Sequence, residues 1–587
     1  MTTKLQAYEL YYKAVFDEDS NATKFWGPIP RTIKDALVFS RQIAIKYQQG
    51  QQPIFSEKRV SELCATIEEL HQNYSMLTGQ VKGHLEQLAQ IPAAVEAGHQ
   101  PAVLGGPGFV LNKIATIIRL AKLQNSVPIM FVGDHDTEQK ELTVIHLPSP
   151  GPSGIAFTLP ISTAFQQSPL HMLPLPSEAW LKSVIQKIDS TYHELATTAS
   201  RKSRQTYTER VEIIKSLLLE TYSRASSLVD WVLRLWMQIS NFKQECGVLF
   251  QRFSNPKIRS LMLPAYEYLL SSKNRLRFIN AMNQASEQLR KLNYQPGIGN
   301  RSKDYVPFHI ECPSQGCNRT RLEPVLKEQA KTSSYSISAT CPKCKETHVI
   351  ETSASNPDLS NWTQYLSPRV DTRAFLVQSF TPVILHVGGP GETSYHAQVL
   401  PGLSAIDSLQ YIFFRYTRMF YDNPWTRRAA LTLQNEKLPV LESGKTQFYK
   451  SAIDANYNEE NEGVVRSLFA AYGEYITDTA KQLTDEEMRI EKERSKAVKT
   501  QRETSDQSTR HRLQAHIGLL TKHRQLLQIY QSQMFGRYAP ERFGQEASFA
   551  WIDMAMSLGP KQVIDRLQNH YQLLTPPAAI FHIAGTT

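Results

Sequence analysis

The sequence predicts an α/β protein built on a parallel sheet, and two strand–turn–helix patterns support this prediction. Between residues 93 and 132, an apolar run (93–97), a glycine-rich turn, a helical pattern (111–123) and a second apolar run (127–132) follow one another. This order is that of a βαβ unit, whose two strands are parallel. The pattern returns at 383–387, which we interpret as a strand that is apolar throughout, followed by another glycine turn and helix. Ligands of such sheets bind beyond the carboxyl ends of the strands.

The composition is that of a folded protein with several domains. Hydrophobic residues make up 41% and charged residues 20% of the 587 residues, which excludes a disordered chain. No stretch reaches the roughly 20 consecutive apolar residues that a membrane helix needs. Met1–Tyr12 has no apolar core of the signal-peptide type, so we expect a cytoplasmic protein. The net charge of +10 is a mild indication of polyanionic partners, and a nucleotide substrate would explain it equally well.

Changes of pattern along the chain divide it into five segments. The α/β signals and helical stretches lie on both sides of a polar, cysteine-bearing and short-stranded segment. We expect a first part of the core with a helical insert at 1–298, a zinc ribbon at 299–355, a second part of the core at 356–465, an antiparallel coiled coil at 466–535, and C-terminal helices that return to the core at 536–587.

The segment near the C-terminus has the spacing of a coiled coil. Apolar residues recur every seven positions from Ile476 to Ala497, and a second apolar stripe at 513–527 follows an entirely polar segment at 499–510. Two helices that fold back around this polar tip would bury both stripes against each other. A single straight helix is the competing interpretation.

The first glycine turn has the character of an anion site. Glycine lets a ligand approach the backbone closely, and the helix behind the turn presents unpaired N–H groups. We therefore expect a phosphate or a carboxylate here, with a purely structural tight turn as the open alternative. The turn matches neither the P-loop nor the dinucleotide fingerprint. Its candidate residues are Gly98, His99, Gln100, Gly105, Gly106, Pro107, Asn112 and Lys113.

Three ionisable residues, Asp134, His135 and Asp136, follow the second predicted strand. The carboxyl end of a strand is where α/β enzymes place catalytic and binding side chains. Either aspartate can bind a substrate ammonium group or Mg²⁺, and His135 can transfer protons near neutral pH. The alternative is that the aspartates cap a turn and His135 is a paired, buried side chain.

The second glycine turn strengthens the prediction of a crevice. Two strand–turn–helix units in one chain would bring two helix N-termini together. Glu392 is a candidate substrate ligand or, equally, an N-terminal cap of the helix. The candidate residues of this turn and its helix are Gly388, Gly389, Gly391, Glu392, Tyr395 and Gln398.

Four cysteines form two pairs, Cys312 with Cys317 and Cys341 with Cys344, separated by 23 residues. This spacing suits tetrahedral zinc, with each pair forming a knuckle and four thiolates closing the coordination shell. We expect a structural zinc site, and residues 335–339 to supply a hairpin of the ribbon. A docking or nucleic-acid role, or attraction of a thiol substrate by the zinc, are the alternatives.

Three segments resemble sequence blocks of the bacillithiol cysteine-adding ligases, in the order of that family. They are GHQPAVLGGPGFVLNKIATIIRLA at 98–121, FVGDHDTEQKE at 131–141, and the block at 366–399 that contains VGGPGETSYHAQ. A fourth, PERFGQE at 540–546, is similar to a shorter element. The resemblance implies a Rossmann-like, nucleotidyltransferase-type core with helical inserts, and a coiled coil that pairs two subunits. It also implies a reaction that joins the carboxyl group of cysteine to the amine of glucosaminyl malate.

Site residues carried over by position from this resemblance fall into two groups. The glycine-turn residues named above, with Asp134, His135 and Asp136, would line one side of the crevice. The other side would be closed by Arg373, Gln378, Gly388, Gly389, Gly391, Glu392, Tyr395 and Gln398. The sequence departs from the family at His99, where the family has glutamine, and in its zinc ribbon. These departures leave the amine acceptor open.

The expected mechanism is amide formation after activation of a carboxylate by ATP with Mg²⁺. Lys113 and the glycine turns would hold the nucleotide phosphates, Asp134 or Asp136 the ammonium group or a metal ion, and His135 the proton of the attacking amine. The expected partners are small molecules (cysteine, an amino-sugar acceptor and a nucleotide) and a second copy of the chain. A nucleic-acid-binding protein, a ligase for another amine and an inactive scaffold are the alternatives.

Overall fold

The core is a five-stranded parallel sheet with the strand order β15-β14-β2-β3-β6. The computed structural model describes residues 5–17, 20–137, 140–149, 151, 154–197, 200–242, 244–329, 333–536 and 544–586. The strands are β2 (Ala94–His99), β3 (Val127–Val132), β6 (Leu249–Arg252), β14 (Val383–Gly388) and β15 (Ile412–Arg415). From β2 the chain adds β3 and then β6 on one side of the sheet. From β14 it adds β15 on the other side. The switch point, where α/β sheets bind ligands, therefore lies between β2 and β14.

Both faces of the sheet are covered, as a parallel sheet requires. Along β3, Met130 and Val132 pack into the apolar cluster that contains α6 (Phe109–Gln124), whereas Ile129 and Phe131 pack into the cluster that contains α14 (Pro390–Ala405). The predicted strand–helix–strand unit is confirmed, and α6 ends at Asn125 in the left-handed conformation that terminates many helices.

One expectation about the sheet is wrong. The strand β14 is buried along its whole length, but it is not apolar throughout, because it contains His386. This histidine lies beside Glu96 of β2 in the sheet register. A buried strand tolerates such a pair because each charge is compensated by the other.

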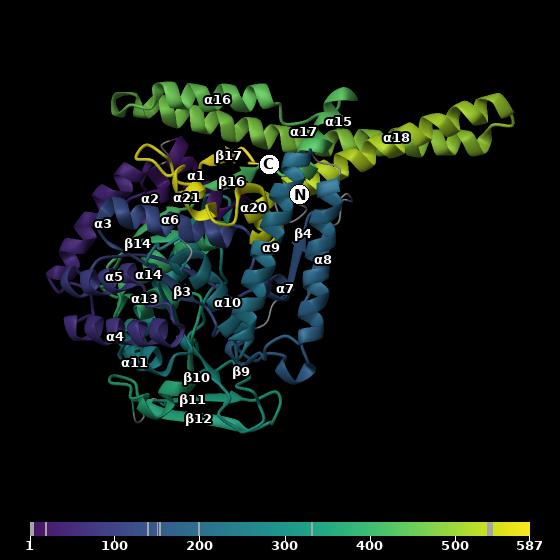
Figure 1. Cartoon of the computed structure of the whole chain (residues 1–587). Helices are drawn as coiled ribbons and strands as arrows, with labels where there is room; N and C mark the ends of the chain where they lie inside the picture. Colours follow the sequence, from purple (N-terminus) through teal and green to yellow (C-terminus); the bar gives the residue numbers. More distant parts are fainter. Residues whose placement is uncertain are drawn as a thin grey trace.

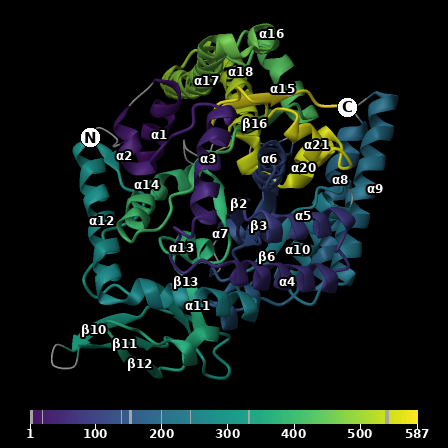
Figure 2. The same ribbon diagram turned by 90° about the vertical axis from the view of Figure 1, so that its left-hand side faces the viewer.

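Helices surround the sheet and fill the rest of the core region (Figures 1 and 2). Among the described residues, no helix combines the length and the apolar character needed to span a membrane. The helices before β2 are α1 (Ala7–Phe16), α2 (Thr23–Trp26), α3 (Ile33–Gln48), α4 (Glu57–Asn73) and α5 (Gly79–Gln90). Those inserted between β3 and the ribbon are α7 (Lys140–Thr143), α8 (Glu178–Thr197), α9 (Arg201–Ser223), α10 (Leu228–Met237), α11 (Pro256–Leu270) and α12 (Ser272–Lys291).

The ribbon segment consists of two small antiparallel sheets with the orders β13-β8-β9 and β10-β11-β12. The residues expected to supply its hairpin, 335–339, lie in the central strand β11, which pairs with both neighbours. The strands are β8 (Phe308–Glu311), β9 (Arg321–Leu322), β10 (Val325–Gln329), β11 (Ser334–Thr340), β12 (Thr347–Ser353) and β13 (Leu366–Pro368). Helix α13 (Arg373–Gln378) then leads back to the core sheet.

Two long helices, α17 (Glu462–Glu503) and α18 (Gln507–Met534), form an antiparallel hairpin. The fold-back is confirmed and the single straight helix is wrong. Gln501 bonds to Gln514 near the tip and Gln528 to Glu487 further down, and Ile476, Leu483, Ile490 and Ala497 are buried. The hairpin and the strands β10–β12 lie at opposite ends of the molecule (Figures 1 and 2).

The C-terminal segment packs against elements of the core. It forms α19 (Gln545–Ser548), α20 (Trp551–Leu558), α21 (Val563–Gln568) and β17 (Ile580–Ile583), which pairs in parallel with β16 (Arg418–Tyr421). Between β16 and α17 lie α15 (Pro424–Asn435) and α16 (Ser443–Asn456). Of the fourth resembling element, residues 540–543 lie outside the described residues.

Candidate active site

A buried charge cluster lies at the switch point between β2 and β14. Lys113 of α6 donates hydrogen bonds to the carbonyl oxygen of Gly98 (3.0 Å) and to Glu392 (2.5 Å). Glu392 also accepts the N–H of Gly389 (2.6 Å) and lies 3.7 Å from His386. His386 pairs with Glu96 through its other ring nitrogen. We call Glu96, Lys113, His386 and Glu392 the switch-point cluster.

The switch-point cluster keeps its histidine charged. Burial would lower the pKa of His386, but Glu96 and Glu392 outweigh it and raise that pKa to about 9. Burial would likewise raise the pKa of Glu392, yet Lys113 and His386 hold it well below its usual range. Two carboxylates and two cations therefore balance each other in a buried site. Both roles expected of Glu392 remain compatible with its position, because it caps α14 and faces the cluster.

A small cavity of about 20 Å³ adjoins this cluster and has room for one water molecule. Its lining includes Glu96, His386 and Arg373, the last of which donates a hydrogen bond to the hydroxyl of Tyr395 (2.8 Å). Arg373 of α13 and Tyr395 of α14 thus line the same cavity as Glu96 and His386.

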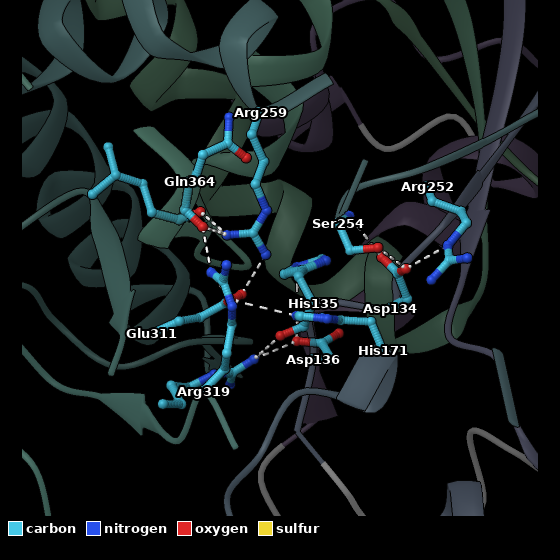
Figure 3. A network of polar contacts seen from close by, with 12 residues as sticks. Asp134, His135, Asp136, His171, Arg252, Ser254, Arg259, Glu311, Arg319 and Gln364 are labelled. Atoms are coloured by element: carbon cyan, nitrogen blue, oxygen red, sulfur yellow. Dashed lines mark hydrogen bonds and ion pairs between the residues drawn. The ribbon is translucent and has the colours of Figure 1, made fainter. Parts of the chain in front are cut away.

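Asp134, His135 and Asp136 follow the carboxyl end of β3, the strand next to β2 in the sheet. Figure 3 shows their polar contacts. Asp134 is fully buried and accepts hydrogen bonds from Arg252 (2.9 Å) and from the N–H (3.0 Å) and hydroxyl of Ser254. These contacts join the ends of β3 and β6. They occupy both oxygens of Asp134, so this carboxylate connects the ends of the two strands.

Asp136 is the more accessible of the two aspartates, with a side chain that is 20% exposed. It accepts hydrogen bonds from Gln100 (3.0 Å) and from Arg321 of β9 (3.0 Å). Burial would raise its pKa, but His135, Arg321 and Arg373 lower it to about 2. Asp136 therefore connects the first glycine turn with the ribbon.

His135 is buried against Phe253, with 4.6 Å between the ring centroids. Burial lowers its pKa to about 3, and the charges of Arg373 and Arg321 act in the same direction. The side chain is therefore neutral near pH 7. Its Nδ1 atom has no hydrogen-bond partner among the described residues.

The first glycine turn divides into two parts with different surroundings. Gly98 and Gln100 bond to Lys113 and Asp136, respectively. Gly105 and Gly106 are instead packed against the C-terminal segment, where the backbone N–H of Trp551 donates to the carbonyl of Gly106 (3.1 Å). A Cβ atom on Gly105 would approach the Trp551 indole nitrogen to 2.8 Å, and φ is positive at both glycines. Here the glycines permit close packing of the chain on itself, which was the open structural alternative.

Several other candidates also lie in packing positions. His99 packs against Phe109 and Trp236, and Pro107 forms an isolated bridge with Ala550. Asn112 bonds to the carbonyl of Thr417 and to Glu546 of α19. Gln398 holds the backbone of Ile298, and Gln378 bonds to Tyr47 and Leu409, away from the switch-point cluster. Gly388 ends β14 and Gly389 is the N-cap of α14, and a Cβ on Gly388 would collide with Phe413.

Four ionisable residues that contribute to these networks were missed from the sequence: Glu96, His386, Arg252 and Arg321. A signal was present for two of them, because Glu96 and His386 are ionisable residues inside otherwise apolar strands. A buried charge of this kind must be paired, and paired buried charges in a crevice are candidates for function. The two arginines carry no comparable local signal.

The four cysteines converge on one point. Their sulfur atoms lie within 4.8 Å of one another, with 3.8 Å between Cys312 and Cys344 and 3.9 Å between Cys317 and Cys341. A tetrahedron with Zn–S bonds of about 2.3 Å has edges of about 3.8 Å, so the donor set fits zinc. Four thiolates fill the coordination shell, and such a site has a structural role. His348 lies 3.5 Å from Cys312, where its N–H can stabilise a thiolate.

The comparisons with known proteins agree with this geometry. A family model described as "Bacillithiol biosynthesis BshC, N-terminal Rossmann-like domain" matches residues 13–407. "Putative cysteine ligase BshC" of Lysinibacillus sphaericus is 22% identical over 510 residues, which cover 85% of this chain and 86% of that protein. The protein of the same name from Staphylococcus aureus is 19% identical (74% and 77% covered), and that from Bacillus velezensis 23% (52% and 51% covered). The chain therefore belongs to the BshC family of bacillithiol biosynthesis.

Proposed function

We propose that this protein is a ligase that joins the carboxyl group of L-cysteine to the amine of glucosaminyl malate, in a bacillithiol-type thiol synthesis. Three findings support the proposal: the family, the Rossmann-like core, and the switch-point cluster, where such cores bind ligands. The single observation that carries it is the buried Lys113–Glu392–His386–Glu96 network. Burying charged side chains costs free energy. A buried set of charges at the place where such cores bind ligands is therefore a candidate for function.

The reaction requires activation of a carboxylate, because an unactivated carboxylate does not acylate an amine in water. One carboxylate oxygen of cysteine attacks a phosphorus atom of ATP, and pyrophosphate or ADP leaves. The amine then attacks the carbonyl carbon, and the same oxygen leaves with AMP or phosphate. Lys113 and the N-terminus of α14 are the groups that would stabilise charge on the transferring phosphorus group.

The structure favours different roles for the residues after β3. Asp136 rather than Asp134 is our candidate for the ammonium group of the substrate, since the Asp136 side chain is 20% exposed whereas that of Asp134 is fully buried. A histidine with a pKa of about 3 is a weak general base near neutral pH. We therefore assign His135 a hydrogen bond to substrate through Nδ1 in place of proton transfer.

We further propose that the enzyme acts in the cytoplasm, where its small-molecule substrates are made, and pairs with a second copy through the α17–α18 hairpin. The exposed apolar side chains Met488 and Leu519 on this hairpin support pairing. Sedimentation velocity tests it: we expect a dimer that Met488→Lys with Leu519→Lys converts to a monomer, and a wild-type monomer would refute the pairing.

A direct assay tests the activity. Purified protein is incubated with cysteine, glucosaminyl malate, ATP and Mg²⁺, and the products are analysed by mass spectrometry. We expect the amide-linked thiol product, and no product when cysteine or ATP is omitted. If a panel of other amino-sugar acceptors yields product and glucosaminyl malate does not, the acceptor is wrong; if none does, the ligase assignment is wrong.

A further inference from the structure

Residues of both cysteine knuckles donate hydrogen bonds to the same backbone carbonyl oxygen of the core. Asn318, directly after Cys317, donates a hydrogen bond to the carbonyl oxygen of Ala164 (2.9 Å). Lys343, between Cys341 and Cys344, donates to the same oxygen (2.7 Å). The N–H of Arg321 adds a bond to the carbonyl of Gln167 (2.9 Å). The ribbon therefore holds a short loop stretch, residues 163–171, which lies between β5 (Ile155–Thr158) and α8, from both knuckles.

This loop stretch is bonded in turn to the residues after β3. The N–H of Leu170 donates to the carbonyl of Asp136 (2.8 Å), and the N–H of His171 donates to the carbonyl of Asp134 (3.0 Å). Thr137 and Pro169 form an isolated β-bridge beside them. The position of the loop stretch thus sets the backbone of the 134–136 turn.

Arg321 adds a direct contact from the ribbon to the same turn. One of its terminal nitrogens donates to the Asp136 carboxylate (3.0 Å) and to the carbonyl of His135 (3.1 Å). Arg321 is four residues after Cys317, so it is displaced whenever that knuckle moves.

The other side of the first knuckle is also anchored. Glu311, which directly precedes Cys312, is fully buried and accepts hydrogen bonds from Arg259 of α11 (2.5 Å) and Arg319 (3.2 Å). It lies 3.4 Å from His171 of the loop stretch (Figure 3). A buried carboxylate with these partners is a rigid connection, because breaking any part of it leaves a charge unpaired.

The metal site joins these contacts into one unit. Cys312 and Cys317 lie between β8 and β9 of one small sheet. Cys341 and Cys344 lie between β11 and β12 of the other. Four thiolates on one zinc ion would fix the two knuckles, and hence Asn318, Lys343 and Arg321, relative to one another.

We propose that the zinc ribbon is a positioning device for the active site: the metal-bound knuckles hold the 163–171 stretch, and Arg321 orients Asp136 and His135. The kinetic part of this inference rests on the proposed ligase function, and the structural part does not. Arg321 acts here through Asp136 and is a positioning residue. A small displacement of such groups lowers turnover strongly, because the reacting atoms must be aligned.

Hydrogen–deuterium exchange of the full-length protein tests the structural part. Zinc is removed with a chelator and then added back, and its content is measured by elemental analysis. We expect exchange in 163–171 and 133–137 to rise without zinc and to return when zinc is restored, while the α17–α18 hairpin stays unchanged. Changes restricted to 312–348 would overturn the proposal. This readout decides it even if the ligase assay finds no product.

Variants test the role of Arg321 while the thiolates stay intact. Arg321→Gln is expected to keep one zinc per chain, to raise exchange at 133–137, and to lower kcat about 10- to 100-fold with a smaller change in KM. Arg321→Lys, which keeps a positive charge without the guanidinium geometry, is expected to recover part of the loss. The matched control is Lys327→Ala, an exposed ribbon lysine on β10. If Arg321→Gln behaves like this control in both readouts, Arg321 has no positioning role.

Discussion

The switch-point cluster and the 134–136 turn lie on the same edge of one sheet, yet they hold their histidines in opposite charge states. His386 lies between Glu96 and Glu392 and has a raised pKa of about 9, whereas His135 has a lowered pKa of about 3. Burial favours the neutral form of both rings. The difference comes from the neighbours, which are two carboxylates in one case and a mixture of carboxylates and arginines in the other.

The two regions also differ in how they are built. The switch-point cluster comes from core elements β2, α6, β14 and α14, while the 134–136 turn takes Arg321 from the ribbon. Arg321 therefore links the second region to the ribbon, while the four side chains of the first region all come from core elements. We infer that charge stabilisation is intrinsic to the core and that alignment of the second region depends on the inserted metal site.

The largest effect on turnover is expected from Lys113→Met, which removes the cation of the switch-point cluster. We expect kcat to fall about 100- to 1,000-fold, since a positioned charge in a buried site contributes this much to a transition state. His386 remains as a cation 3.7 Å from Glu392, and circular dichroism checks that the variant is folded before its kcat is compared. The matched control on the same helix is Lys122→Met, at an exposed position, with unchanged kcat. Equal kcat values for the two variants would remove Lys113 from the mechanism.

Asp134→Asn tests the other region, the 134–136 turn, through its effect on stability. It leaves Arg252 without its buried partner, and breaking such a pair costs about 3 kcal/mol of unfolding free energy. Urea unfolding measures it, with Asp189→Asn as a control that disrupts an exposed pair with Lys215 and should cost under about 1 kcal/mol. A lost activity with unchanged stability would instead make Asp134 a catalytic group.

The pH dependence of stability should separate the two histidines. The folded pKa of His386 is raised, so its contribution is complete below about pH 6.5 and is lost as pH rises through about 9. The folded pKa of His135 is lowered, so its contribution is present above about pH 6.5 and is lost as pH falls towards about 3. Melting temperatures across this range should show a weaker alkaline loss in His386→Gln and a weaker acid loss in His135→Gln. The same pH profile in both variants would contradict the opposite charge states.

Local sequence patterns were sufficient for the elements of the fold. The apolar runs on either side of α6, the seven-residue spacing in α17 and the paired cysteines each reflect a short-range physical requirement, so each could be predicted. The Glu96–His386 pair could not, because it depends on the register of two strands 290 residues apart. The need for a glycine at Gly105 could not be predicted either, because it arises from the close approach of Trp551, which lies near the C-terminus. Contacts between distant segments decide which candidate residues lie at the switch point between β2 and β14.

The most direct test of the central claim follows the oxygen atoms of cysteine. Cysteine labelled with ¹⁸O in both carboxylate oxygens is supplied with ATP, Mg²⁺ and the acceptor, and the products are analysed by mass spectrometry. We expect one ¹⁸O in the new amide and the other in AMP or phosphate, with both signals lost in Lys113→Met. Amide formation without any ¹⁸O in a phosphorus-containing product would contradict carboxylate activation at the switch-point cluster.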